Sequence, residues 1–319
     1  MNWKRSTMIP FRWLLMGSLA CPLISPVSLH GEVGKPQEVT QGVWFHEGDL
    51  VRKGQCNNGW IIFKDHVLVI DANWPSAAKE ILAKIRQTTD KPVRFAFDSH
   101  HHGDHAYGNE VWRAQGATIV AHEGVIQEMQ TYEPGLYGKG SGRWEEEAAK
   151  RTDVAESKLA PPTLLFPNAM IFDDGQQRVE LIHFGIAHTH GDAFAWLPKE
   201  GILFSGDACV NGPYNYMGDG HTGQWIQTLE SVRALEPKIV CPGHGLIGGP
   251  EILDHQIEYI RSLRNEVRAL VQTGKDLDAV KDMAPVLKEK IQLNDRIANY
   301  VGSFFEAQIE KMFDELNER

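Results

Sequence analysis

This 319-residue chain has few cysteines and no excess of positive charge. Its four cysteines form no C-x-x-C pair and no regular spacing, so a disulfide framework is not expected and the fold must depend on a hydrophobic core. The 32 Lys and Arg residues are outnumbered by 42 Asp and Glu residues, which gives a net charge of -10. Because nucleic acids are bound mainly through positive charge, this balance argues against a nucleic-acid partner.

The chain also lacks a convincing membrane-spanning segment near its N-terminus. The apolar run at residues 13–20 is shorter than the roughly 20 residues that a spanning helix needs. Three basic residues precede this run, and Ser18-Leu19-Ala20 is a small-x-small cleavage pattern. The segment therefore predicts a signal peptide over residues 1–20 and a periplasmic or secreted protein. Cys21 follows the cleavage position, so lipid attachment, and with it a membrane location, is an alternative.

Short apolar runs alternate with segments of helical periodicity through most of the remaining chain. Residues 21–40 show no periodic apolar face and predict a linker. The domain that follows, at residues 41–250, is predicted to be an α/β fold with two sheets sandwiched between helices. Residues 251–319 are predicted to form helices, over 252–273 and roughly 277–316, that pack on the same domain. The predicted strands lie at 43–46, 59–64, 67–70, 92–97, 118–121, 163–166, 170–172, 179–183, 193–197, 201–204 and 239–241, and the predicted helices at 75–87, 109–115, 123–130 and 223–235.

Residues 132–162 interrupt this alternation with four closely spaced glycines and a charged helical stretch at 144–158. Glycine-rich loops can bind phosphate, but no strand leads into this one and it has no Gly-Lys-Ser signature. We therefore interpret the segment as an insertion that forms a mobile loop or lid.

The segment Asp98-Ser-His-His-His-Gly-Asp-His105 directly follows the predicted strand at 92–97. Neutral imidazoles together with carboxylates suit zinc and similar divalent ions. His100 and His102 are two residues apart and so share one side of an extended backbone, while Asp104 and His105 turn back toward the same centre. The segment predicts a metal site at the end of this strand.

Three further polar segments stand at the ends of predicted strands: Ala187-His-Thr-His-Gly-Asp192, Phe204-Ser-Gly-Asp207 and Cys241-Pro-Gly-His-Gly245. With the histidine segment they form the ordered pattern His-x-His-x-Asp-His, a lone His, Gly-Asp and Gly-His. This pattern resembles the metallo-β-lactamase superfamily over roughly residues 40–250. The resemblance implies a four-layer αββα sandwich and a metal-dependent hydrolase.

The resemblance also implies a site for two Zn²⁺ ions, with iron or manganese as alternatives. The implied ligands are His100, His102 and His188 for one ion and Asp104, His105 and His244 for the other, with Asp207 bridging them. Three imidazoles and a shared carboxylate leave a position open for water, which is typical of a catalytic zinc site. The two ions would share a hydroxide that attacks the substrate, and Asp104 is the predicted catalytic group because it can orient the nucleophile or pass its proton to the leaving group.

Three neighbouring residues are assigned by their position in these segments. Asp71 ends the strand at 67–70 and matches a family aspartate that supports the histidine loop. His101 is expected to point away from the metals, and His190 to face the pocket rim or solvent. We expect Tyr214 and Tyr216, which follow the bridging aspartate, at the pocket mouth.

The implied substrate is a small molecule with an ester, thioester, lactone or amide-like bond. Some zinc β-lactamases have a cysteine at the position of Asp207. With aspartate there, the site is more similar to those of glyoxalase II, lactonases and ribonuclease Z. An RNA substrate, as in ribonuclease Z, fits the acidic chain poorly. The residues within these motifs are most similar to those of exported zinc hydrolases that are associated with quinoprotein or sulfur-oxidation systems.

Three alternatives remain open, and so does the oligomeric state. An iron-dependent persulfide dioxygenase of the same fold would use only His100, His188 and Asp207. A β-lactam hydrolase is a second alternative. A non-catalytic binding module is a third, although it would predict damaged metal motifs, whereas all seven ligand positions are intact.

Overall fold

The computed structural model of the protein describes residues 31–317. The predicted signal peptide and Cys21 lie outside these residues. Within the described range, no helix combines the length and apolar character required to cross a membrane.

The first sheet has seven strands in sequence order, from β1 to β7. The first four strands pair antiparallel and the last four pair parallel. A parallel pair needs a crossover, and helices α2 (Pro75–Thr88) and α4 (Asn109–Ala114) supply two of them. The strands are β1 (Pro36–Thr40), β2 (Val43–His46), β3 (Asn58–Ile62), β4 (Val67–Ile70), β5 (Val93–Asp98), β6 (Thr118–His122) and β7 (Leu164–Phe166).

Strand β1 occupies the last five residues of the segment that the sequence predicts to be a linker. It lies at the edge of the sheet and pairs only with β2. Val39 is its one buried residue, so it carries no alternating apolar pattern that could mark it as a strand. A four-residue helix, α1 (Leu50–Lys53), then separates β2 from β3.

The second sheet has five strands in the order β12-β11-β10-β9-β8. Neighbouring strands are antiparallel except β11 and β12, which are parallel. The strands are β8 (Ala169–Asp173), β9 (Arg178–Ile182), β10 (Phe194–Leu197), β11 (Ile202–Phe204) and β12 (Ile239–Cys241).

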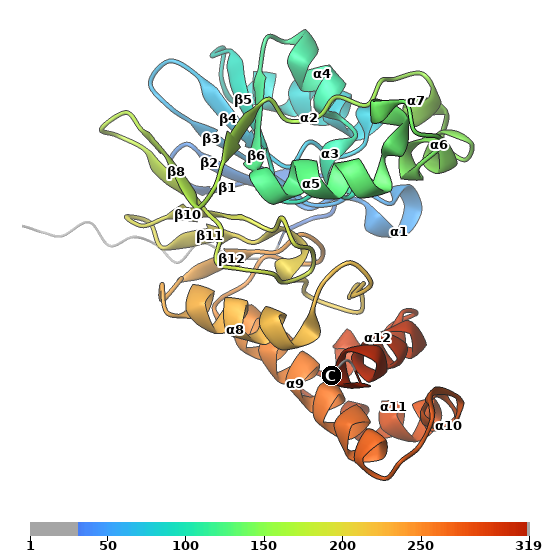
Figure 1. Ribbon diagram of the computed structural model, residues 1–319. Helices are drawn as coiled ribbons and strands as arrows, with labels where there is room; N and C mark the ends of the chain where they lie inside the picture. Colours follow the sequence, from blue (N-terminus) through green and yellow to red (C-terminus); the bar gives the residue numbers. More distant parts are fainter. Residues whose placement is uncertain (1–30, 318–319) are drawn as a thin grey trace, which may run out of the picture.

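Three buried apolar layers hold the two sheets and their helices together. Phe97 of the first sheet and Leu181 of the second belong to the layer between the sheets. Ile81 of α2 packs in a layer on the outer face of the first sheet, and Trp225 of α8 (Thr222–Arg233) in a layer on the outer face of the second. Helix α9 (Glu251–Gln272) packs beside α8 (Figure 1). The predicted αββα sandwich is confirmed.

The segment 132–162 forms short helices that are anchored to the first half of the molecule. After α5 (Glu123–Tyr132) it contains η1 (Pro134–Tyr137), α6 (Arg143–Ala148) and α7 (Thr152–Ala155). Val154 is buried in one cluster with Trp74 and Tyr107. Asp153 Oδ2 accepts hydrogen bonds from the backbone N–H and the hydroxyl of Ser76.

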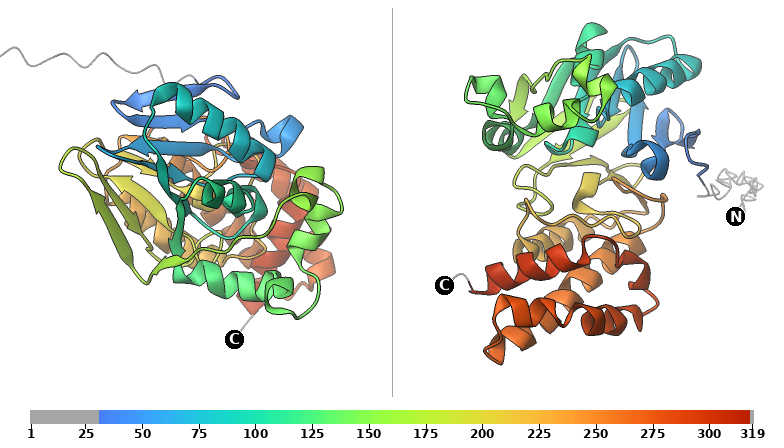
Figure 2. Two further views of the ribbon diagram at one scale, coloured as in Figure 1. Left: turned by 90° about the horizontal axis from the view of Figure 1, so that it is seen from above. Right: turned by 90° about the vertical axis from the view of Figure 1, so that its right-hand side faces the viewer.

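The chain after α9 forms several shorter helices that lie at the end of the molecule away from the first sheet (Figure 2, right, red). These are α10 (Leu277–Lys281), α11 (Ala284–Gln292), η3 (Ala298–Tyr300) and α12 (Phe305–Asn317). Pro285 stands in the first turn of α11, where proline is tolerated because the backbone N–H that it lacks would have no acceptor within the helix. Ile291 and Ile309 share a buried cluster with residues of α8 and α9.

Candidate metal centre

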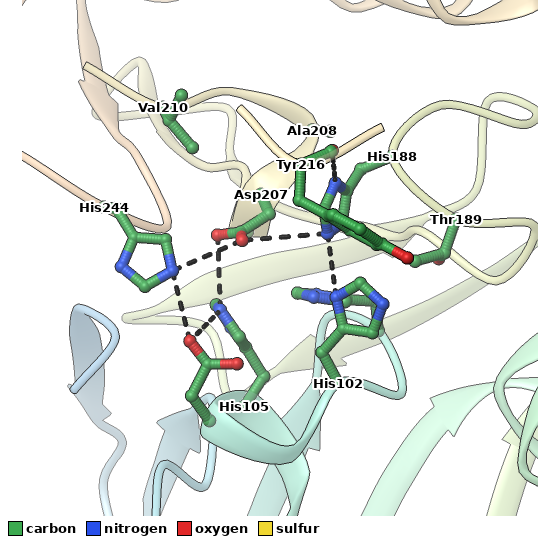
Figure 3. A network of polar contacts seen from close by, with 12 residues as sticks. His102, His105, His188, Thr189, Asp207, Ala208, Val210, Tyr216 and His244 are labelled. Atoms are coloured by element: carbon green, nitrogen blue, oxygen red, sulfur yellow. Dashed lines mark hydrogen bonds and ion pairs between the residues drawn. The ribbon is translucent and has the colours of Figure 1, made fainter. Parts of the chain in front are cut away.

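Loops from both sheets meet at one edge of the sandwich and bring the seven predicted ligands together (Figure 3). Residues 99–102 follow β5 and lead into α3 (Gly103–Ala106), which carries two of the ligands. Further ligands follow β9, β11 and β12, the one after β11 in the short helix η2 (Gly206–Ala208). In chain order they are His100, His102, Asp104, His105, His188, Asp207 and His244.

His100, His102 and His188 form the first group, with one ligand atom from each within 4.8 Å of the others. His188 Nε2 lies 2.9 Å from His102 Nδ1. Burial and the neighbouring imidazole of His102 lower the pKa of His188 to about 3, and burial lowers that of His100 as well. His100 Nε2 is buried without a hydrogen-bond partner among the described residues. These are the properties of neutral imidazoles that are ready to bind a cation.

Asp104, His105 and His244 form the second group, also within 4.8 Å. His244 Nε2 lies 3.2 Å from Asp104 Oδ2 and 3.3 Å from Asp207 Oδ2. Burial lowers the pKa of His244, but the charge of Asp207 and hydrogen bonds to both carboxylates outweigh it and raise the pKa to about 9. The protein thus concentrates carboxylate charge where a cation would be stabilised.

Asp207 lies between the two groups. Its Oδ1 is 3.2 Å from His105 Nε2, and its Oδ2 is 3.7 Å from His188 Nε2 and 3.3 Å from His244 Nε2 (Figure 3). Ligand atoms at the zinc–ligand distance in a tetrahedral site lie about 3.3 Å from one another. The contacts of Asp207 bracket this value, so the residues present fit two ions that share one carboxylate.

Two glycines allow Asp207 to reach this position. Gly206 has a φ of +49°, and a Cβ there would lie 2.3 Å from Ser99 Oγ. A Cβ on Gly243 would lie 2.0 Å from Asp207 Oδ1. The glycines of the Gly-Asp and Gly-His segments are therefore required by the close approach of the loops.

Asp71 supports the histidine loop, which confirms its predicted contact. Its Oδ1 accepts a hydrogen bond of 2.9 Å from Ser99 N, and its Oδ2 lies 3.0 Å from His105 Nδ1. Because the carboxylate can only accept at Nδ1, His105 keeps its Nε2 lone pair for the metal side. Asp71 has a φ of 60°, a conformation that Asp and Asn adopt more readily than most residues.

Asp104 is the most exposed of the acidic residues in the cluster, with 22% of its side chain accessible. Burial raises its pKa, but the charge of His105 and a hydrogen bond to His244 outweigh burial and hold the pKa below its usual value. Asp104 therefore remains ionised and can accept a hydrogen bond from an attacking water, which is the orienting part of its predicted role.

His101 and His190 both lie outside the two groups, as predicted. His190 is exposed. His101 is 1% exposed, and its Nδ1 lies 2.5 Å from Glu128 Oε2. Its Nε2 lies 3.7 Å from Asp219 Oδ2, so it belongs to a buried polar network behind His102.

Asp219 and Arg143 belong to this network, and sequence reasoning missed both. Asp219 Oδ2 lies 2.8 Å from His102 Nε2, and Arg143 Nη1 donates a 2.5 Å hydrogen bond to the same oxygen. The two residues are 76 positions apart and neither stands in a recognised motif. No sequence signal marked them.

Aromatic residues surround the ligands on one side. The ring of Tyr216 lies 5.7 Å from that of His102 and 5.6 Å from Phe304, which is 40% exposed. Tyr214 lies 6.1 Å from His244. Trp225, in contrast, is fully buried and donates to the carbonyl of Ala208, which makes it a core residue.

This cluster at the edge of an αββα sandwich defines a metal-binding hydrolytic centre. The family model of the metallo-β-lactamase superfamily matches residues 51–244, and the chain belongs to this superfamily. Its members are metal-dependent hydrolases, and so is this chain.

Characterised relatives agree with this assignment at low identity. The metallo-β-lactamase type 2 of Bacillus cereus is 23% identical over 233 residues, which cover 70% of this chain and 81% of the relative. The hydroxyacylglutathione hydrolase of Rhodospirillum rubrum is 26% identical over 208 residues, which cover 63% of this chain and 68% of the relative.

Solved structures show the same fold. A metallo-β-lactamase from Pontibacter korlensis superposes with a TM-score of 0.58 at 21% identity, covering 71% of this chain and 98% of the other. The DIM-1 metallo-β-lactamase gives a TM-score of 0.55 at 21% identity, covering 72% and 98%.

Proposed function

We propose that the protein is a dinuclear zinc hydrolase that cleaves an ester, thioester, lactone or amide-like bond of a small molecule. The observation that carries the proposal is the place of Asp207, which contacts His188 of one ligand group and His105 and His244 of the other. A carboxylate shared in this way supports two neighbouring ions rather than one.

When bound, two zinc ions supply an acidified water molecule and polarise the oxygen of the scissile bond. The side chains supply the rest. The buried imidazoles and Asp207 hold the charge in a site of low dielectric constant, where electrostatic interactions are strong. Asp104, at the more open side, orients the attacking water and moves its proton to the leaving group through its carboxylate.

The substrate class is supported by the site and by the relatives together. The relatives are named as a metallo-β-lactamase and as a hydroxyacylglutathione hydrolase, so an acyl thioester and a β-lactam are the two substrate kinds to compare. Asp207, rather than cysteine, at the bridging position favours the first kind of substrate over β-lactams. The aromatic residues Tyr214, Tyr216 and Phe304 beside the ligands suit a substrate with an apolar portion.

The first experiment measures metal per chain in the purified mature protein and assays hydrolysis of a thioester, a lactone and a β-lactam. About two zinc ions and chelator-sensitive hydrolysis that zinc restores would support the proposal and rank the substrates. One iron ion and no hydrolysis would refute it and favour persulfide oxidation. Hydrolysis of the β-lactam alone would refute the preference for acyl thioesters.

We also propose that the protein acts in the periplasm or is secreted, because residues 1–20 have the pattern of a signal peptide. Mass spectrometry of the mature protein gives its first residue. Cleavage before Cys21 without added lipid mass is expected, whereas an intact N-terminus in the cytosol would contradict export.

A further inference from the structure

Asp219 connects the insertion at 132–162 to the candidate ligand His102. Its Oδ2 lies 2.8 Å from His102 Nε2. From the insertion, Arg143 approaches Asp219 with both terminal nitrogens: Nη1 is 2.5 Å from Oδ2 and Nη2 is 3.0 Å from Oδ1. The side chain of Asp219 is only 4% exposed, whereas that of Arg143 is 33% exposed, so the carboxylate is buried and the guanidinium closes it off from solvent.

The contact with Asp219 determines which nitrogen of His102 can bind a metal. A carboxylate only accepts hydrogen bonds, so Nε2 of His102 carries the proton and Nδ1 keeps its lone pair. Nδ1 is the atom that lies 2.9 Å from His188 Nε2, inside the first ligand group.

Arg143 is itself held in place by the insertion. Its guanidinium carbon lies 3.7 Å from the ring centre of Tyr132, a cation–π contact. The next residue, Trp144, donates its backbone N–H to Glu133 Oε2 at 2.8 Å. The start of α6 is therefore fixed in the orientation that directs Arg143 toward Asp219.

The same residues could be taken for a third metal site, because His101, His102 and Asp219 bring ligand atoms within 4.8 Å. The guanidinium of Arg143 argues against this. It occupies both oxygens of Asp219, and its Nη1 lies 3.4 Å from His101 Nε2. A metal ion at this position would be repelled by the positive charge of Arg143, which already pairs with Asp219.

We propose that Asp219 is a positioning residue for His102, and that Arg143 makes the insertion part of this support for the first metal group. The inference rests on the proposed function, since it assumes that His102 binds a metal. It assigns the insertion a structural task at the metal centre in addition to any role as a lid. Partners of this kind typically change metal affinity by about 10- to 100-fold when they are removed.

The test is a zinc titration against a competing chelator with wild type, Asp219→Ala, Asp219→Asn and Arg143→Gln. Asp219→Ala is expected to lower the affinity for one of the two zinc ions by about 10- to 100-fold and to leave the affinity for the other unchanged. Asp219→Asn keeps an acceptor oxygen, so its zinc affinity should lie between those of wild type and Asp219→Ala. Arg143→Gln should weaken the same ion by a smaller factor, since Asp219 itself remains.

The pair Arg151–Asp153 provides matched controls within the same insertion. Arg151 also lies over an aromatic ring, that of Trp74, and also pairs with an aspartate, but it does not contact the cluster. Arg151→Gln and Asp153→Asn should leave both zinc affinities unchanged. Equal losses in these controls, unchanged affinities in Asp219→Ala, or a third zinc ion in wild type would each overturn the inference.

A measurement on the metal-free protein separates this inference from the proposed function. Nitrogen chemical shifts of the histidine rings at pH 8 report which nitrogen carries the proton. His102 is expected to be protonated at Nε2 in wild type and to become a mixture in Asp219→Ala. If wild type binds no zinc, the proposed function fails while this tautomer result still decides the role of Asp219; a mixture already present in wild type would refute that role.

Discussion

Replacing Asp71 tests separately how the protein holds the histidine loop and how it prepares His105 for a metal. The two carboxylate oxygens have different partners: Oδ1 accepts from Ser99 N at 2.9 Å and Oδ2 faces His105 Nδ1 at 3.0 Å. Alanine removes both acceptors. Asparagine keeps one of them and changes the other into a donor, so the two variants should differ in kind.

The expected loss of stability for Asp71→Ala follows from two local terms. The buried Ser99 N–H loses its acceptor, which costs about 1 to 3 kcal/mol. Alanine at a φ of 60° costs about 1 to 2 kcal/mol more. The free energy of unfolding of the metal-free protein should therefore fall by about 2 to 5 kcal/mol.

Asp71→Asn should leave stability within about 1 kcal/mol of wild type, because asparagine tolerates this backbone conformation and its oxygen can still accept from Ser99. That hydrogen bond turns the amide –NH₂ toward His105 Nδ1. His105 then accepts at Nδ1 and carries its proton on Nε2, where the metal should bind. Zinc affinity is expected to fall by about 10- to 100-fold despite the intact fold.

Urea unfolding of the metal-free variants and zinc titration against a chelator are the two assays. The reasoning is refuted if Asp71→Asn destabilises the protein as much as alanine does, or if Asp71→Asn binds both zinc ions as tightly as wild type. A loss of less than about 1 kcal/mol in Asp71→Ala would show that Ser99 N–H finds another acceptor.

Four further predictions concern the ligands, the loops and pH. His188→Ala should lose one zinc ion and nearly all hydrolysis. The variant of its exposed neighbour, His190→Ala, should keep two zinc ions per chain and full hydrolysis, which metal analysis and the hydrolysis assay will show. Gly243→Ala places a Cβ 2.0 Å from Asp207 Oδ1, so zinc affinity should fall; an unchanged affinity would mean that the loop can move aside. Burial, helped by the charge of Lys84, lowers the pKa of His46 to about 4, so protonation favours the unfolded chain. The free energy of unfolding should therefore decrease by about 3 kcal/mol from pH 7 to pH 4. His46→Gln should remove this part of the pH dependence of stability. Chelation should lower Tm, and zinc at 1,000 times its Kd should restore about 4 kcal/mol per ion.

The order of the His and Asp motifs in the sequence, through its resemblance to the metallo-β-lactamase superfamily, predicted both the αββα sandwich and the seven metal ligands. The structure confirms the sandwich, and the metal-binding roles stay a prediction. The segments that contain His100, Asp207 and His244 each follow an apolar run that ends a buried strand, so their side chains are delivered to strand ends. His188 instead lies in a loop after the half-buried strand β9. His100 and His244 are far apart in the chain, but the order of their motifs already identified one site. Strand periodicity and the clustering of His and Asp residues can be recognised in consecutive residues, whereas the division of the ligands between two metal ions follows from the family resemblance.

Tertiary structure decided the rest. The edge strand β1 buries only Val39 and acquires its structure from pairing with β2, which no local pattern marks. His101 becomes buried because Glu128 of α5 meets it. Asp219 and Arg143 acquire their roles only when the loop before α8 and the insertion come together behind His102. A metal ligand's own identity can be predicted from its neighbours in the chain, but its supporting hydrogen bonds come from whichever residues the packing brings within about 3 Å.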